Sequence, residues 1–105
     1  MKKGSKRIFR DTTSGSGEDI ECVNIGLPAT IVAQRLDVYG YSSEVEDVEG
    51  DPYSVYWVAN IVTGEKIYFP ESGLLRFYVT EGSSDVFIPE NQLEHFESAI
   101  GWKLI

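Results

Sequence analysis

The sequence predicts a mainly β protein, built as a small antiparallel barrel or roll with one short helix near the C-terminus. Short runs rich in β-branched and aromatic residues recur along the chain, and Gly, Pro, Asp and Ser separate them. The spacings between these runs are too short for the helical crossovers that parallel strands need. With 105 residues, 42% of them hydrophobic and 25% charged, we expect a single globular domain over residues 1–105.

Charge divides the chain into two parts. The first ten residues hold five of the nine basic side chains and no acidic one, whereas residues 11–105 hold the other four and all 17 acidic ones. Within residues 1–19 we predict a basic strand at Lys6–Arg10 and a flexible loop over residues 11–19, where small polar residues predominate. Residues 20–105 are the acidic β body.

The body begins with a strand at Ile20–Ile25 and a turn at residues 26–28. We predict a further strand over residues 29–38, because Pro28 and the β-branched pair Ile31-Val32 favour extended backbone over a helix. Residues 39–52 are rich in acidic side chains and end in Gly-Asp-Pro, which indicates a long acidic loop.

The centre of the sequence holds the clearest strand pattern. Tyr53–Val62 reads as a strand, Thr63-Gly64 as a tight turn and Glu65–Phe69 as the returning strand of a hairpin. Leu74–Thr80 predicts another strand, and residues 81–84 form a turn after it.

The C-terminal part predicts a short strand at Asp85–Ile88 and then a helix at about residues 89–100. Pro89 suits the first turn of a helix, where its missing N–H is harmless. Apolar residues follow with helical spacing, and Gly101 is a natural helix stop. The last residues, Trp102–Ile105, read as a final strand.

One local pattern occurs twice, 19 residues apart. Residues 69–77 and 88–96 share the order apolar-Pro-Glu-Ser/Asn-x-Leu-x-x-Phe. In such a segment Pro ends a strand, while Glu and Ser or Asn satisfy the free N–H groups of a helical turn. We expect a 3₁₀ or α turn at each place, with Leu74 and Leu93 in the core.

The order of these signals resembles that of SH3-like small β-barrels over about residues 4–77. The matching segments are the Gly-led basic strand 4–9, the Gly-x-x-Ala-Thr-Ile-Val segment 26–32, the Tyr-led strand 53–58 and the Pro-containing turn 69–74. The resemblance implies an SH3-like barrel or roll. It leaves the function open, because small barrels of this kind serve peptide binding, nucleic-acid binding and subunit roles.

The residue pattern predicts no catalytic centre, no cofactor and no metal site. Glu90, Glu94 and Glu97 share a helix face beside His95, but a second set of ligands is lacking, so a solvated helix face explains them better. Cys22 is expected to be a small buried residue, because its acidic neighbours oppose a thiolate. We therefore expect a protein that is not an enzyme.

The acidic segment is the strongest candidate for a binding surface. Its carboxylates can steer a cationic surface into contact, and its tyrosines give rigid contact area. We assign partner binding to Tyr39, Tyr41, Glu44, Glu46, Asp47, Glu49, Asp51 and Tyr53. This predicts a protein-binding module: a small acidic inhibitor or regulator of a basic or nucleic-acid-handling protein, of the kind that phages and mobile elements carry.

Two alternatives remain. The first is nucleic-acid binding through the basic residues Lys2, Lys3, Lys6, Arg7 and Arg10, which ranks lower because the acidic body would repel the nucleic acid. The second is a structural subunit or small-ligand barrel whose pocket is lined by Trp57, Tyr68, Phe77 and Tyr78.

The location follows from the same residues. No apolar segment follows Lys2 and Lys3, and no run approaches the roughly 20 residues of a bilayer crossing, so we expect neither a signal peptide nor membrane contact. With Cys22 as the single cysteine, we expect a cytoplasmic protein. The partner's identity and the oligomeric state stay open.

Overall fold

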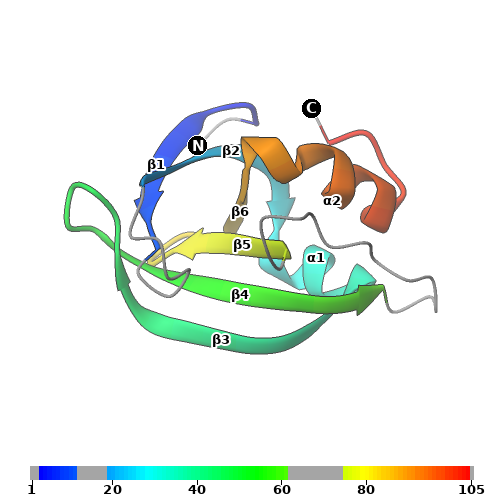
Figure 1. Cartoon of the computed structure of the whole chain (residues 1–105), viewed down its shortest axis with the longest axis horizontal. Coiled ribbons are helices and arrows are strands. Elements are labelled where there is room, and N and C mark those ends of the chain that lie inside the picture. Colours follow the sequence, from blue (N-terminus) through cyan, green and yellow to red (C-terminus); the bar gives the residue numbers. More distant parts are fainter. Residues whose placement is uncertain (1–2, 12–18, 62–74, 105) are drawn as a thin grey trace.

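The computed structural model describes residues 3–11, 19–61 and 75–104, with the backbone alone at residues 37, 39 and 59–61. Six strands, two α-helices and one 3₁₀ helix follow one another along these residues (Figure 1). They are β1 (Lys6–Arg10), β2 (Asp19–Pro28), α1 (Ala29–Arg35), β3 (Leu36–Glu46), β4 (Pro52–Ile61), β5 (Leu75–Thr80), β6 (Asp85–Pro89), η2 (Glu90–Gln92) and α2 (Leu93–Ile100).

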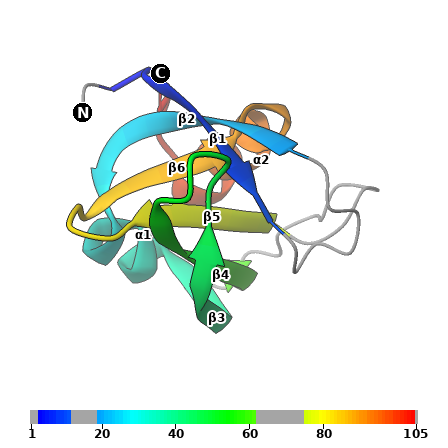
Figure 2. The ribbon, with the colours of Figure 1, turned by 90° about the vertical axis from the view of Figure 1, so that its left-hand side faces the viewer.

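The strands form one antiparallel sheet in the order β1-β2-β6-β5-β4-β3. The sheet curls until its two edge strands approach each other, and an isolated antiparallel bridge joins Phe9 of β1 to Asp47, the residue that follows β3. Figure 2 shows β1 crossing beside the end of the β3–β4 hairpin. We call this junction the seam. The result is a small antiparallel half-barrel, which confirms the predicted fold class.

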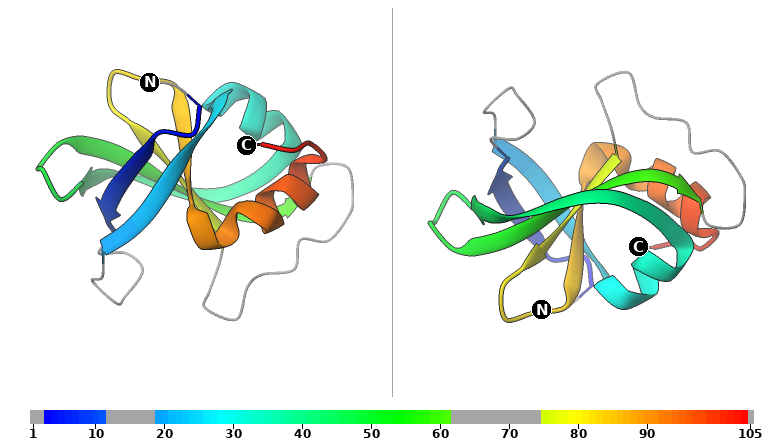
Figure 3. Two further views of the ribbon diagram at one scale, coloured as in Figure 1. Left: turned by 90° about the horizontal axis from the view of Figure 1, so that it is seen from above. Right: turned by 90° about the horizontal axis from the view of Figure 1, so that it is seen from below.

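Two cores lie on opposite faces of the sheet, because neighbouring residues of a strand point to opposite sides. In β5, Phe77 belongs to the first core and Tyr78 to the second. α1 and α2 contribute Val32, Phe96 and further residues to the first core (Figure 3 shows both helices from above and below). The second core consists of Phe9, Cys22, Val45, Tyr53, Val55, Tyr78 and Phe87.

Phe9 anchors the edge strand β1 in the second core. Its ring stacks on Tyr78 with a centroid distance of 5.0 Å, and it meets Tyr53 and Phe87 edge-on at 4.6 and 5.6 Å. Phe9 is fully buried, and burying such a side chain contributes about 1.5–3 kcal/mol. The short strand β1 is therefore held by one aromatic residue as well as by its pairing with β2.

The predicted strand over residues 29–38 is wrong in its first seven residues, which form α1. Pro28 has an extended backbone and precedes the helix, where its missing N–H costs nothing. Val32 turns inward and is fully buried in the first core. The gain from burying Val32 outweighs the weak strand preference of the Ile31-Val32 pair.

The predicted acidic loop over residues 39–52 is also wrong. Residues 39–46 continue β3, and only residues 47–51 form a turn before β4. The sequence looks like a loop because β3 is an edge strand, with exposed polar side chains and three irregularities in its register with β4. The acidic residues therefore stand on a hairpin, which we call the acidic hairpin (residues 36–61).

The helix predicted at 89–100 and its stop at Gly101 are confirmed. Its first turn is the 3₁₀ helix η2, as the repeated pattern predicts, and Leu93 packs against the first core. Gly101 adopts a left-handed backbone (φ 87°), and its N–H donates to the Glu97 carbonyl at 2.8 Å.

Two smaller predictions are wrong. Residues 26–28 continue β2 through a register irregularity after Asn24 and do not form a separate turn. Residues 102–104 form no strand. The predicted returning strand 65–69, the turn at 63–64, the first copy of the repeated pattern with Leu74, and most of the loop 11–19 lie outside the described residues.

Candidate functional site

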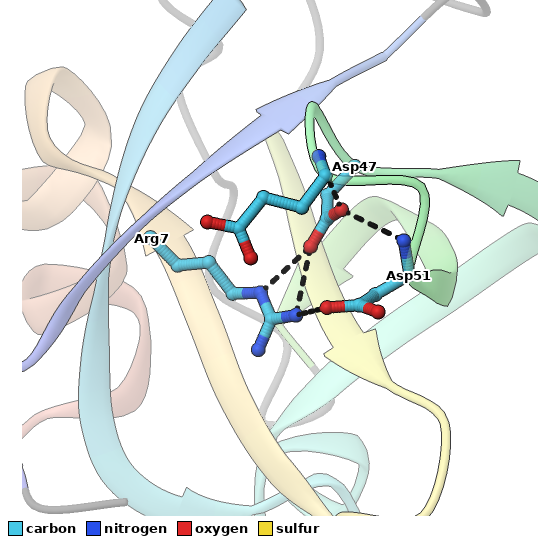
Figure 4. A network of polar contacts seen from close by, with 4 residues as sticks. Arg7, Asp47 and Asp51 are labelled. Carbon is cyan, nitrogen blue, oxygen red and sulfur yellow. Dashed lines mark hydrogen bonds and ion pairs between the residues drawn. The ribbon is translucent and has the colours of Figure 1, made fainter.

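An ion-pair network ties β1 to the turn of the acidic hairpin (Figure 4). Arg7 donates from Nε and Nη2 to Asp47 Oδ2 at 3.0 and 2.7 Å, and Nη2 also donates to Asp51 Oδ2 at 2.9 Å. Asp47 is 2% exposed and Arg7 19%, whereas Asp51 is 58% exposed. The Arg7–Asp47 contact is thus the buried part of the seam, and Asp51 forms its outer rim.

Asp47 also organises the turn itself. Its Oδ1 accepts the backbone N–H groups of Glu49 and Asp51, each at 2.9 Å. Its backbone carbonyl accepts from Gly50, whose φ of 88° suits glycine. Burial alone would raise the pKa of Asp47, but the hydrogen bonds from Arg7, Asp51 and Glu49 outweigh it and hold the pKa below its ordinary value.

The eight residues predicted for partner binding divide into two groups. Asp47 and Tyr53 are buried, and the Tyr53 hydroxyl donates to the Arg10 carbonyl at 3.0 Å, so both side chains serve the fold. The exposed members are Tyr41, Glu44, Glu46, Glu49 and Asp51. Tyr39 lies in β3, with its side chain outside the described part of the structure. The exposed carboxylates are what the acidic hairpin offers to solvent.

Tyr41 is 67% exposed and stands at the outer end of an aromatic ladder. Its ring stacks on Tyr56 of the neighbouring strand at 5.7 Å, and Tyr56 stacks on Phe77 at 4.9 Å. These are directly opposed residues in the sheet. Cross-strand aromatic pairs of this kind fix the ring of Tyr41 without burying it.

The basic residues predicted for nucleic-acid binding are largely neutralised. Lys6 pairs with Glu90 at 2.9 Å, and that hydrogen-bonded partner raises the pKa of Lys6. Arg7 pairs with Asp47 and Asp51, and Arg10 pairs with Asp19 at 3.1 Å. Lys3 is exposed, and Lys2 lies outside the described residues. These side chains do not form a free basic surface in the described part of the chain.

Two grooves flank the turn of the acidic hairpin. One has a volume of about 450 Å³ and is lined by Lys6, Arg7, Ile8, Glu21, Asp47, Val48, Glu49 and Asp51. The other, of about 520 Å³, is lined by Arg10, Ser43, Glu44, Val45, Glu46, Asp47 and Pro52. The sequence reasoning missed Ile8 and Val48, each 39% exposed, although an apolar residue inside an acidic run is a signal that could have pointed to Val48.

The aromatic residues predicted to line a ligand pocket do not come together. Phe77 is buried in the first core, Tyr78 is buried in the second core on the opposite face, and Trp57 packs against the second core. Tyr68 lies outside the described residues. The three described aromatic rings fill the two cores.

The second core contains one buried polar cluster. Asp11 is fully buried, and its Oδ2 accepts a hydrogen bond from the Tyr78 hydroxyl at 2.9 Å and lies 3.8 Å from Arg76 Nε. Burial, with Asp11 nearby, raises the pKa of Tyr78 and of Tyr53. Burial likewise raises the pKa of the Cys22 thiol, which makes this free cysteine a poor nucleophile.

Two of the three helix-face carboxylates have partners in the fold. Glu90 pairs with Lys6, and Glu97 Oε2 accepts the backbone N–H of Leu104 at 2.8 Å. Among the residues that the structure describes, no three His, Cys, Asp or Glu side chains are placed to hold a metal ion. Within the same residues, no helix is long and apolar enough to cross a membrane.

No protein-family model matches this chain, and no curated protein or solved structure shows a significant match to it.

Proposed function

We propose that this protein is a non-enzymatic protein-binding module of the SH3-like barrel class, which acts in the cytoplasm as an inhibitor or regulator of a basic or nucleic-acid-handling protein. The half-barrel architecture is compatible with that class. The binding surface is the set of exposed carboxylates on the acidic hairpin, Glu44, Glu46, Glu49 and Asp51, which we call the acidic tip.

The observation that carries the proposal is the rigid support under the acidic tip. The Asp47 carboxylate pairs with Arg7 and accepts two N–H groups of the turn. These contacts hold the turn in the geometry described above. The neighbouring carboxylates project from that turn and from β3, and among the described residues only Asp51 of this group pairs with a cation, Arg7. Carboxylates on a preorganised scaffold raise association rates with basic partners at little ordering cost.

Nucleic-acid binding has weaker support. Lys6, Arg7 and Arg10 each pair with a carboxylate, and five phosphate contacts would need these side chains free. The body of the protein carries a large excess of acidic residues. These charges favour a basic protein over a polyanion as the partner.

Affinity capture from the native cell tests the proposal. The test variant combines Glu46→Lys with Glu49→Lys, and the matched control combines Glu81→Lys with Glu94→Lys, which are exposed and lie outside the hairpin. Both double variants change the net charge equally. We expect the wild type and the control to retain one basic protein and the test variant to lose at least ~90% of it. Equal recovery with the two double variants, or no specific capture by the wild type, would contradict the proposal.

A further inference from the structure

The groove of about 450 Å³ at the seam combines an apolar surface with uncompensated negative charge. We propose that this seam groove binds an arginine or lysine side chain from an extended basic segment of the partner protein, with the methylene stem against Ile8 and Val48 and the cation at Glu21 and Glu49. The inference rests on the proposed function and names the part of the partner that enters the site.

The backbone pairing places the two apolar side chains next to each other. Phe9 and Asp47 form an antiparallel bridge, so Ile8, which precedes Phe9, lies beside Val48, which follows Asp47. Each is 39% exposed, and no other Ile, Leu or Val among the residues with described side chains is exposed. An exposed Ile–Val pair at one seam is the kind of surface that the stem of a long cationic side chain covers.

The charges of the groove favour a cation. Two basic and four acidic side chains line it. Lys6 pairs with Glu90, outside the groove, and lies within the electrostatic reach of Glu21, while Arg7 pairs with Asp47 and Asp51. The acidic side chains of the lining nevertheless outnumber the basic ones. Glu21 and Glu49 are exposed, and Glu21 lies directly opposite Ile8 in the β1–β2 pairing. The two carboxylates thus lie beside the apolar pair.

The groove is also preorganised. One side is β1, which is anchored by Phe9 in the second core, and the other is the turn held by Asp47. Arg7 and Asp47 connect the two sides through two hydrogen bonds. A volume of about 450 Å³ falls in the range of pockets that hold small molecules, and it has room for a single long side chain with its peptide backbone.

The probe is the capped peptide Gly-Gly-Arg-Gly-Gly, compared with the same peptide carrying citrulline, which has nearly the shape of arginine but no charge. Titration is followed by the methyl NMR signals of Ile8 and Val48. We expect the arginine peptide to shift both signals with weak, about millimolar affinity, and the citrulline peptide to shift neither at the same concentration.

Two variants locate the contact. Glu49→Gln removes one carboxylate and Val48→Ser removes the apolar contact; both positions are exposed, so the fold persists. We expect each variant to weaken arginine-peptide binding by about two- to fivefold, the size of one exposed charge or methyl contact. Glu44→Gln is the control, because Glu44 belongs to the acidic tip but lies outside the groove, and it should leave the affinity unchanged.

The outcomes separate the two proposals. Three results would overturn the groove assignment: equal binding of the citrulline peptide, equal weakening by Glu44→Gln, or no methyl shift. The acidic-tip proposal would still stand if partner capture depended on the charge of the acidic tip. Loss of the Ile8 methyl shift in Val48→Ser, together with partner capture that does not depend on charge, would support the groove and contradict the broader proposal. The peptide titration therefore tests the groove, and the capture experiment tests the acidic tip.

Discussion

The Tyr78 hydroxyl donates a 2.9 Å hydrogen bond to Asp11 across 67 residues of sequence, and both side chains are buried. This pair ties the residue that follows β1 to the middle strand β5. It places a polar side chain beside an aromatic core, where burial is costly unless hydrogen-bond partners are in place.

Tyr78→Phe should destabilise the protein by about 1–3 kcal/mol, because the buried Asp11 loses one hydrogen-bond donor while the ring packing is kept. Urea unfolding followed by tryptophan fluorescence measures the change. Tyr41→Phe is the matched control, since Tyr41 is exposed, and it should change the free energy of unfolding by less than about 0.5 kcal/mol. Similar losses in the two variants would contradict the role given to the buried pair.

Asp47→Asn should lower the free energy of unfolding by about 2 kcal/mol, because the neutral amide no longer pairs with Arg7 and presents an N–H group to it. Asp51→Asn changes the same kind of side chain on the same turn, but Asp51 is 58% exposed, so we expect less than about 1 kcal/mol. Thermal and urea unfolding give both values. An Asp51→Asn variant that is as unstable as Asp47→Asn would show that the buried contact is not the stabilising one.

The lowered pKa of Asp47 predicts an acid-dependent loss of stability. In the unfolded chain the Asp47 carboxyl has its ordinary pKa of 3.8, and in the folded protein its pKa is lower. The ionised Asp47 side chain therefore stabilises the folded state at pH values above 3.8. This contribution is fully present at neutral pH and is lost as the pH falls through the folded-state pKa. Unfolding free energies at pH values between about 5 and 2 should fall more steeply for the wild type than for Asp47→Asn. Parallel curves would contradict the prediction.

Cys22 should be inert in the folded protein. It is fully buried in the second core and its pKa is raised, so the thiolate is scarce and out of reach. A thiol-specific disulfide reagent should react only with opened molecules, and the rate should rise in Asp47→Asn about tenfold for each ~1.4 kcal/mol of lost stability. Rapid labelling of the native wild type would indicate that β2 opens locally.

Except for β3, the described strands and the C-terminal helix could be predicted because each carries its own local signal. β5 alternates apolar and other residues, and the helix has Pro89 before it and Gly101 after it. α1 could not be predicted, because its seven residues have no strong preference and only the burial of Val32 in the first core decides the outcome. Tertiary packing here overrides local preference.

The candidate binding surface was predictable only in part. The acidic run is visible in the sequence, but its polarity suggested a loop, whereas it stands on an edge strand. The shorter side chain of Asp47 suits the turn better than that of Glu46, but nothing local predicts that Asp47 is buried on Arg7 while Glu46 is exposed. That difference comes from β1, forty residues away, and the register that brings Ile8 beside Val48 comes from the curl of the whole sheet.

The single bridge between Phe9 and Asp47 has a consequence for how copies of this protein meet at high concentration. The edge strands β1 and β3 are the two rims of the sheet, and this bridge joins the rim at β1 to the residue that follows β3. When the bridge opens, both rims expose unpaired backbone groups. Each rim could then accept the opposite rim of a second molecule, and such head-to-tail pairing leaves an open rim at each end to which further copies can add. The guanidinium of Arg7 beside the bridge and the irregular backbone of β3 therefore disfavour edge-to-edge polymerisation.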